Sequence, residues 1–201
     1  MQGSGRRGRQ DLDADAQIEA AKAQGRDVLS FKCRPGKPSA APGSGKEDSV
    51  QQPEDYADLA AATDRWRDVF SDMWDAEAVV VWGRTYRTHQ HAFQSAKFIA
   101  AGLSEAAAMF TVDSGDPIGQ GAAHLARRAG NNVAKLTAKQ WALWEAARPQ
   151  MKDDIYAAKF REGSLAAKVL RATNNALLVN NGAMKVVCTR LMQRRDALLE
   201  R

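Results

Sequence analysis

Apolar residues recur at helical spacing along most of the chain, and two short apolar runs interrupt that pattern. From residue 53 onward, apolar positions repeat three and four residues apart, which is the spacing of one face of an α-helix. The runs at 78–82 and 176–179 predict strands, with turns at Gly83-Arg84 and at Asn180-Asn181-Gly182. The pattern predicts an α+β fold that is mainly helical with few short strands. The first predicted helix covers 53–75, and two more begin at Thr88 and at Ser104. Further helices are predicted over 120–128, over 137–161 with a kink or restart at Pro149, over 165–172, and from 183 to the end.

The first 52 residues have a different composition. Residues 10–24 favour one short helix, Val28–Phe31 is the one apolar patch, and residues 35–53 are rich in Pro, Gly, Ser and Lys. Such a segment buries too little apolar area to offset its ordering entropy. We therefore predict an extended basic, Pro/Gly-rich tail and linker over residues 1–52 and one domain over residues 53–201. Deleting the tail should leave that domain folded.

One polar stripe stands out in the helix predicted to begin at Thr88. In a helix, Gln90, Gln94 and Lys97 share one face at i, i+4 and i+7. Phe93 and Phe98 point elsewhere and can anchor the helix in a core. The stripe fits either the wall of a polar pocket or the solvated face of an ordinary amphipathic helix.

Charge and cysteine content limit the functional classes only weakly. A formal net charge of +5 permits binding to phosphates but does not require it. The cluster Arg6-Arg7-Gly8-Arg9 is typical either of a plain flexible tail or of an arm that lies on RNA or on an acidic neighbour. Cys33 and Cys188 form no disulfide framework, which favours a reducing, intracellular compartment, either the cytoplasm or an organelle such as the mitochondrion. No apolar run is long enough to predict a membrane span or a secretory signal.

The chain lacks the common local motifs of catalytic and nucleotide-binding sites. The chain has no phosphate-binding loop, no dinucleotide-binding glycine pattern after a strand, no nucleophile elbow and no H-E-x-x-H. His89 and His91 would diverge by about 200° in a helix, and no third ligand lies nearby. We predict no metal site and no cofactor.

The order of several short motifs resembles that of the NADAR family, also called YbiA-like. The family pattern runs F-S-N-F, then T-S-E-H-x-F-Q-x-x-K-F, then W…K-F, then L-L-x-T…L-V-E. The stretch His91 to Phe98 carries the most specific part of the match, and the resemblance extends from about Phe70 to Leu199. The matching residues are Phe70-Ser71-Asp72-Met73, Thr88 to Phe98, Trp144, Lys159-Phe160, Leu170, Thr173 and Leu177-Leu178-Val179.

The resemblance implies an α+β domain with a pocket for ribosylated nucleotides. Family members are N-glycosidases that hydrolyse phosphoribosylated intermediates of riboflavin synthesis or remove ADP-ribose from modified nucleobases. A carboxylate suits this reaction, because cleavage builds positive charge on the ribose and needs an activated water. This chain departs from the pattern: Gln90 replaces the motif Glu, Asn180 replaces the Glu of L-V-E, and Asp72 replaces the Asn of F-S-N-F. The family's aromatic-Gly-rich loop before the last helix is also missing.

Two accounts follow from these departures. In the first, the fold persists without catalysis, and the chain is a structural or interaction subunit of a larger ribonucleoprotein or organellar assembly, meeting protein subunits or RNA through its tail. In the second, Asp72 or Glu145 supplies the carboxylate and the chain is a divergent N-glycosidase. A third class keeps binding of ADP-ribose or a nucleotide without hydrolysis. The residues that the resemblance assigns to binding are Gln90, Gln94, Lys97, Trp144 and Asn180.

Overall fold

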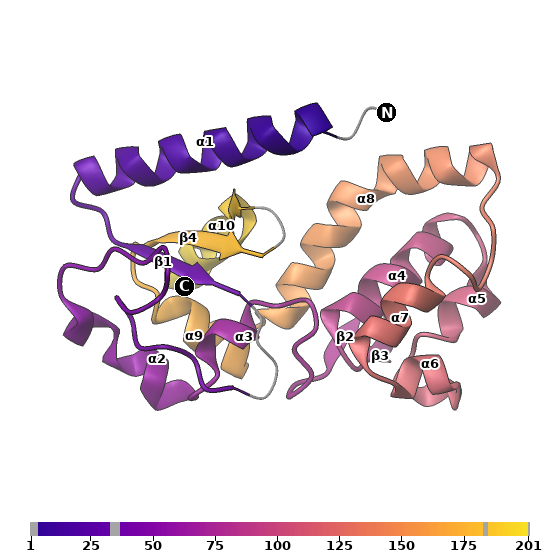
Figure 1. Ribbon diagram of the computed structural model, residues 1–201. Coiled ribbons are helices and arrows are strands. Elements are labelled where there is room, and N and C mark those ends of the chain that lie inside the picture. The colour runs from indigo at the N-terminus through magenta and orange to yellow at the C-terminus, as the bar shows by residue number, and fades with distance from the viewer. Residues whose placement is uncertain (1–3, 33–36, 183–184, 201) are drawn as a thin grey trace. The chain divides into compact units, whose positions relative to one another are not determined.

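The computed structural model describes residues 4–32, 37–182 and 185–200 (Figure 1). Cys33 and the side chains of the Arg6-Arg7-Gly8-Arg9 cluster lie outside the described part. The fold is α+β and mainly helical, as the periodicity predicted. Its contacts divide the chain into a terminal unit, residues 1–71 with 165–201, and a central unit, residues 72–164. This division does not follow the boundary predicted at residue 53.

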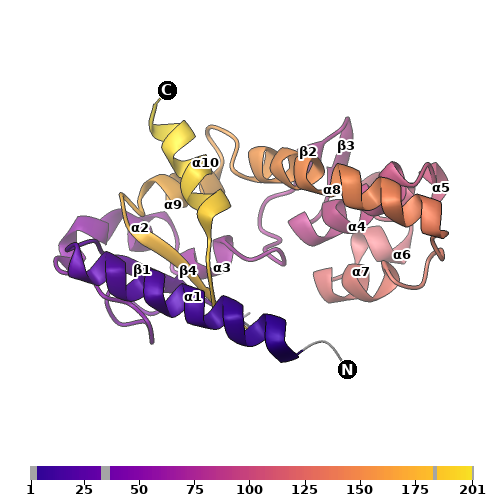
Figure 2. The same cartoon turned by 90° about the horizontal axis from the view of Figure 1, so that it is seen from above.

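The terminal unit is built on a three-stranded sheet in the order β1-β4-β5. Strand β1 (Val28–Phe31) runs parallel to β4 (Leu177–Asn181), and β5 (Lys185–Val187) pairs antiparallel with β4. Helix α1 (Ser4–Ala23) lies along one side of the sheet (Figures 1 and 2). Its Ile18 and Ala21 pack in one buried cluster with side chains of β1 and β4. The remaining elements of this unit are η1 (Pro53–Tyr56), α2 (Ala57–Ala62), α3 (Trp66–Val69), α9 (Leu165–Arg171) and α10 (Thr189–Leu199).

The helix predicted over residues 10–24 overlaps α1, but the extended tail predicted for residues 1–52 is wrong over β1. All four residues of β1 are buried, and Val28 pairs with Leu177 of β4. Successive side chains of a strand point to opposite faces of the sheet, so burial of the whole strand means that both faces are covered. The apolar patch was visible in the sequence, but its partner strand lies near the other end of the chain.

A buried carboxylate organises the segment that was predicted to be a linker. The side chain of Asp48 has no exposed area. Its Oδ1 accepts hydrogen bonds from Ser30 N at 2.8 Å, Ser30 Oγ at 3.0 Å and Arg67 Nη1 at 3.2 Å. Its Oδ2 accepts from Gly43 N at 3.1 Å, Gly45 N at 2.9 Å and Arg67 Nη2 at 2.6 Å. A full set of donors offsets the cost of burying this charge, because the bonds replace the lost hydration.

Arg67 also donates hydrogen bonds to backbone carbonyl groups of the segment before Asp48. Its Nε donates to Ala40 O at 3.2 Å and its Nη2 to Ala41 O at 3.1 Å. Its guanidinium lies 4.0 Å from the ring centroid of Trp66, at the start of α3. Side-chain donors thus satisfy carbonyl groups that no helix or sheet satisfies, which allows an irregular segment to be held in place.

Helix α4 (His89–Ala100) contacts most other elements of the central unit. Contacts join α4 to α5 (Ser104–Ala108), α7 (Ala123–Ala129) and α8 (Ala138–Lys159). A hairpin of β2 (Val79–Val81) and β3 (Arg84–Tyr86) precedes α4, and η2 (Val112–Ser114) and α6 (Pro117–Gln120) follow α5. The hairpin turn falls at Trp82 and Gly83, with φ of 52° and 70°. Positive φ at both central residues is the type I′ pattern of two-residue hairpins.

The helix starts predicted at Thr88 and at Thr137 are confirmed. Helix α4 begins after Thr88, whose side chain accepts from His91 N. Helix α8 begins with a capping box between Thr137 and Gln140. It continues through Pro149 for 22 residues, and its ribbon changes direction along its length (Figure 1), which a proline inside a helix explains.

Two helix predictions are wrong. The segment 53–75 contains three short helices, η1, α2 and α3, with Thr63 in extended conformation between α2 and α3. The last helix does not follow the Asn180–Gly182 turn directly, because Val186 and Val187 pair with β4 as part of β5. Residues 183–184, where that helix was predicted to begin, lie outside the described part. In the described part of the chain, no helix combines the length and the apolar character that a membrane span requires.

Replacing Asp48 by Asn should destabilise the terminal unit by about 3–5 kcal/mol, because the buried guanidinium of Arg67 then lacks its counter-charge. Burial alone would raise the pKa of Asp48, but hydrogen bonds and charge from Arg67, with the N–H groups of Ser30 and Gly45, lower it below 3.8. The stabilisation is therefore complete above about pH 5 and is lost progressively as pH falls through the unfolded-state and then the folded-state pKa. Urea unfolding at several pH values measures both effects. The exposed carboxylate change Glu19→Gln is the control, and equal stability of the two variants would contradict the network.

Deleting residues 1–52 should unfold the terminal unit, contrary to the expectation for a detached tail. The deletion removes β1 and the buried side chains Val28, Leu29 and Phe31, leaving one edge of β4 unpaired. Far-UV circular dichroism and limited proteolysis would show the loss. A truncated chain with an unchanged unfolding midpoint would show that α1 and β1 contribute nothing to stability.

Candidate functional site

The two histidines at the start of α4 have different partners. The Nδ1 of His91 lies 2.8 Å from Thr88 Oγ1, and its Nε2 lies 3.0 Å from the carbonyl oxygen of Ile118. The Nδ1 of His89 lies 2.8 Å from Asp72 Oδ1, and its ring meets the ring of Tyr156 edge-on at 4.9 Å. The helix separates the two rings as predicted. Among the described residues, no group of three or more His, Cys, Asp or Glu side chains could hold a metal ion.

Asp72 lies beside the position that carries the family's motif Glu. Its backbone oxygen accepts a hydrogen bond from Gln90 N at 2.8 Å. The carboxylate is 54% exposed and contacts the buried ring of His89. Loss of hydration would raise the pKa of Asp72, but the charge and contact of His89, with the charges of Lys159 and Lys152, lower it well below its usual range. The result is an ionised carboxylate with solvent access at the first turn of α4.

The polar stripe of α4 is buried, so the interpretation as a solvated face is wrong. Gln90, Gln94 and Lys97 are 8%, 9% and 7% exposed. The amine of Lys97 donates to the carbonyl oxygen of Gly130, at the end of α7, and lies 4.7 Å from the ring centroid of Phe98. Burial lowers the pKa of Lys97. The amine of Lys97 is thus engaged in a hydrogen bond within the protein.

Gly130 fits tightly against the same stripe. A Cβ on residue 130 would lie 1.9 Å from Oε1 of Gln94, so any larger residue there requires the Gln94 side chain to move. Beyond Lys97, a small cavity of about 280 Å³ is lined by Gly130, Trp141 and their neighbours. Gln90 and Gln94 do not line that cavity.

The other residues that the resemblance assigned lie in different settings. Trp144 is 3% exposed, and its ring meets that of Phe93 edge-on at 5.4 Å in the core of the central unit. Glu145 is exposed and pairs with Arg148 at 3.0 Å. Asn180 belongs to the terminal unit, where its Oδ1 accepts from Gly182 N at 3.0 Å. Asp72, Gln90, Gln94, Lys97 and Trp144 all belong to the central unit.

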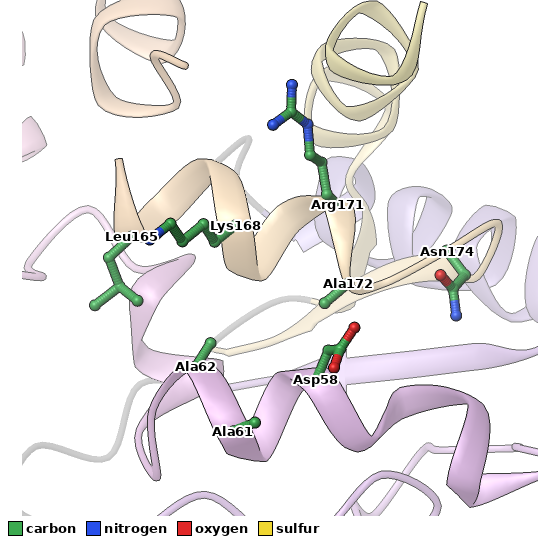
Figure 3. Close-up of a pocket in the computed structure, with 8 residues that line it drawn as sticks. All are labelled: Asp58, Ala61, Ala62, Leu165, Lys168, Arg171, Ala172 and Asn174. Carbon is green, nitrogen blue, oxygen red and sulfur yellow. The ribbon is translucent and has the colours of Figure 1, made fainter. Parts of the chain in front are cut away.

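A cavity of about 630 Å³ in the terminal unit lies between α2 and α9 (Figure 3). Ala61, Ala62 and Ala172 form much of its wall. The guanidinium of Arg171 points away from α2, and its Nη2 donates to the carbonyl oxygen of Leu198 at 2.9 Å. The side chain of Lys168 follows α9 toward Leu165 (Figure 3). Asp58 and Asn174 also line this cavity, so its polar groups are of mixed charge.

A cavity of about 500 Å³ in the terminal unit has a different lining. It is bounded by the end of β1, the segment held by Asp48, and the end of β4, with Lys32, Lys37 and Lys46 on its wall. Sequence analysis missed this cavity because its lysines fall in a stretch whose composition predicts a linker. The spacing of these lysines shows no helical or strand period that would have placed them together.

Comparisons with known proteins add one similarity. No family model matches the chain, and no curated protein matches it. A search of solved structures finds the NMR structure of the E. coli protein YbiA, with 21% sequence identity and a TM-score of 0.45. The match covers 86% of this chain and 83% of that one.

Replacing Gly130 by Ala should cost about 1–3 kcal/mol of stability, because the new methyl group collides with the amide of Gln94. Combining it with Gln94→Ala removes the colliding atoms, so the double variant should be more stable than the sum of the two single changes. Urea unfolding of the four proteins measures this coupling. Strict additivity would show that the two residues do not touch.

Proposed function

We propose that this chain is a non-catalytic NADAR-like protein that serves as a structural or interaction subunit of a larger assembly. The observation that carries the proposal is that the polar residues of α4, Gln90 and Lys97, lack the charge and the access that a catalytic site needs. Gln90 occupies the position of the motif Glu, and an amide supplies neither a negative charge nor a base. Lys97, which would meet a ligand, is 7% exposed and bonded to the carbonyl of Gly130.

The chemistry of N-glycosidic cleavage explains why these two features matter together. The transition state carries positive charge on the sugar ring, and a preorganised carboxylate stabilises it. Electrostatic stabilisation of this kind is lost when an amide replaces the carboxylate. A lysine that packs against Phe98 and Gly130 is likewise committed to holding α4 against the end of α7.

Exposed apolar side chains support the interaction role. Trp141 and Leu143 on α8 are 45% and 48% exposed, and Leu125 on α7 is 41% exposed. Aromatic side chains of this kind are enriched where proteins bind one another. The partners that the proposal implies are other protein subunits, with RNA as a second class that would meet the basic cluster Arg6-Arg7-Gly8-Arg9.

One observation favours a second candidate, a divergent N-glycosidase. The backbone bond from Gln90 N to Asp72 O holds Asp72 beside the position of the missing Glu. Its carboxylate is ionised and reaches solvent, so it has the charge that an oxocarbenium-like transition state requires. Glu145 pairs with Arg148 on the exposed side of α8 and is the weaker choice.

The full chain should not hydrolyse an ADP-ribosylated nucleobase or a phosphoribosylated pyrimidine above the rate of its Asp72→Asn variant. Mass spectrometry of the released sugar phosphate measures this. Glu145→Gln is the matched control, since it makes the same change at an exposed carboxylate. Turnover that Asp72→Asn abolishes and Glu145→Gln leaves intact would establish the glycosidase instead.

The same preparations test the other parts of the proposal. Chain isolated from its native source should elute well above its own mass of 21.9 kDa, and elution as a monomer would contradict the assembly role. Tight binding of ADP-ribose that is lost in Lys97→Ala, without turnover, would identify a binding protein.

A further inference from the structure

The cavity of about 500 Å³ in the terminal unit lies at the carboxyl ends of two parallel strands. Lys32 follows directly after β1, and Asn181 and Gly182 lie at the end of β4. Because β1 and β4 are parallel, their carboxyl ends meet at the same edge of the sheet. Ligands of parallel sheets bind in crevices at that edge. The segment held by Asp48 forms the remaining wall, through Ser44, Gly45 and Lys46.

The charge of this cavity is positive and unbalanced. Three lysines, Lys32, Lys37 and Lys46, line it, and within the described ranges none of them has a hydrogen-bond or ion-pair partner. The carboxylates nearby are already engaged with other cations. Asp68 pairs with Arg65 at 2.9 Å, Asp48 with Arg67 at 2.6 Å, and Glu47 with Lys185 at 3.4 Å.

Arg67 contributes to the wall without being available to a ligand. Its guanidinium nitrogens are bonded to Asp48 and to the carbonyl oxygens of Ser30, Ala40 and Ala41. The arginine therefore fixes the shape of the cavity. The three lysine amines, compact charges on flexible stems, are the groups that remain to bind an anion.

We propose that this cavity binds a small phosphate-bearing anion, such as a phosphate or diphosphate ester. Lysine amines are common phosphate ligands in proteins, and three of them on one cavity wall match the charge of a diphosphate. The volume falls within the range of small-molecule sites, about 300–1,000 Å³. The lysines line a cavity and not a flat face, which favours a small molecule over a nucleic acid strand. The inference stands whether or not the central unit is catalytic.

Isothermal titration of the full chain with inorganic pyrophosphate at low ionic strength tests this proposal. We expect saturable one-to-one binding that weakens as salt is added. The triple variant Lys32→Ala, Lys37→Ala, Lys46→Ala should bind about tenfold more weakly or worse, since each lost charge-assisted bond lowers affinity. The triple change to Arg should keep most of the affinity. Lys139→Ala, an exposed lysine of α8, should bind as the unchanged chain does.

Unfolding curves of the triple variants separate loss of binding from loss of fold. Because the three lysines have no partners in the described structure, their replacement should leave the unfolding midpoint unchanged. Absence of saturable pyrophosphate binding would overturn the proposal. So would an equal loss in Lys139→Ala, which indicates diffuse attraction, or a triple variant that loses affinity for single-stranded RNA while keeping its affinity for pyrophosphate.

Discussion

The buried ion pair between Asp48 and Arg67 is the interaction on which the terminal unit depends. Removing two charges from water is costly, and their mutual attraction compensates only when hydrogen bonds satisfy the remaining donors and acceptors. Here they do: the carboxylate also accepts from Ser30 on β1 and from two glycine N–H groups, and the guanidinium binds loop carbonyls. One carboxylate thereby joins a strand, an irregular segment and the helix α3, and shapes the wall of the lysine-lined cavity.

Six charged side chains in the described part of the chain fall into two groups. Arg67 and Lys97 are buried, bonded to the fold and committed to holding elements together. Asp72 reaches solvent with its charge intact, and the cavity lysines Lys32, Lys37 and Lys46 have no partners in the described part of the chain. A group whose bonding capacity is already filled by the protein has little left for a ligand. Asp72 and the three cavity lysines are therefore better placed to bind a ligand than Lys97, to which the family resemblance assigned that role.

The start of α4 is held by local contacts that do not involve the side chain of residue 90. Thr88 caps the helix, His91 bonds back to that cap, and the N–H of Gln90 bonds to Asp72. None of these bonds needs a carboxylate at position 90. The side chain at position 90 can therefore differ from the family pattern without changing these local contacts. Asp72, whose backbone oxygen accepts from Gln90 N, places a carboxylate beside this turn.

The sequence by itself determined the features that depend on neighbours a few residues apart. The helix starts near Thr88 and Thr137, the apolar runs of β2 and β4, the helical class and the amide at Gln90 were all legible, because hydrophobic periodicity is a local property of the sequence. Only the tertiary structure decided that Val28 pairs with Leu177, that Asp48 meets Arg67, and that Lys97 is buried against Gly130. These contacts join residues far apart in the chain. Composition predicted a free linker over residues 35–53 because it cannot show which distant donors will satisfy a segment's polar groups.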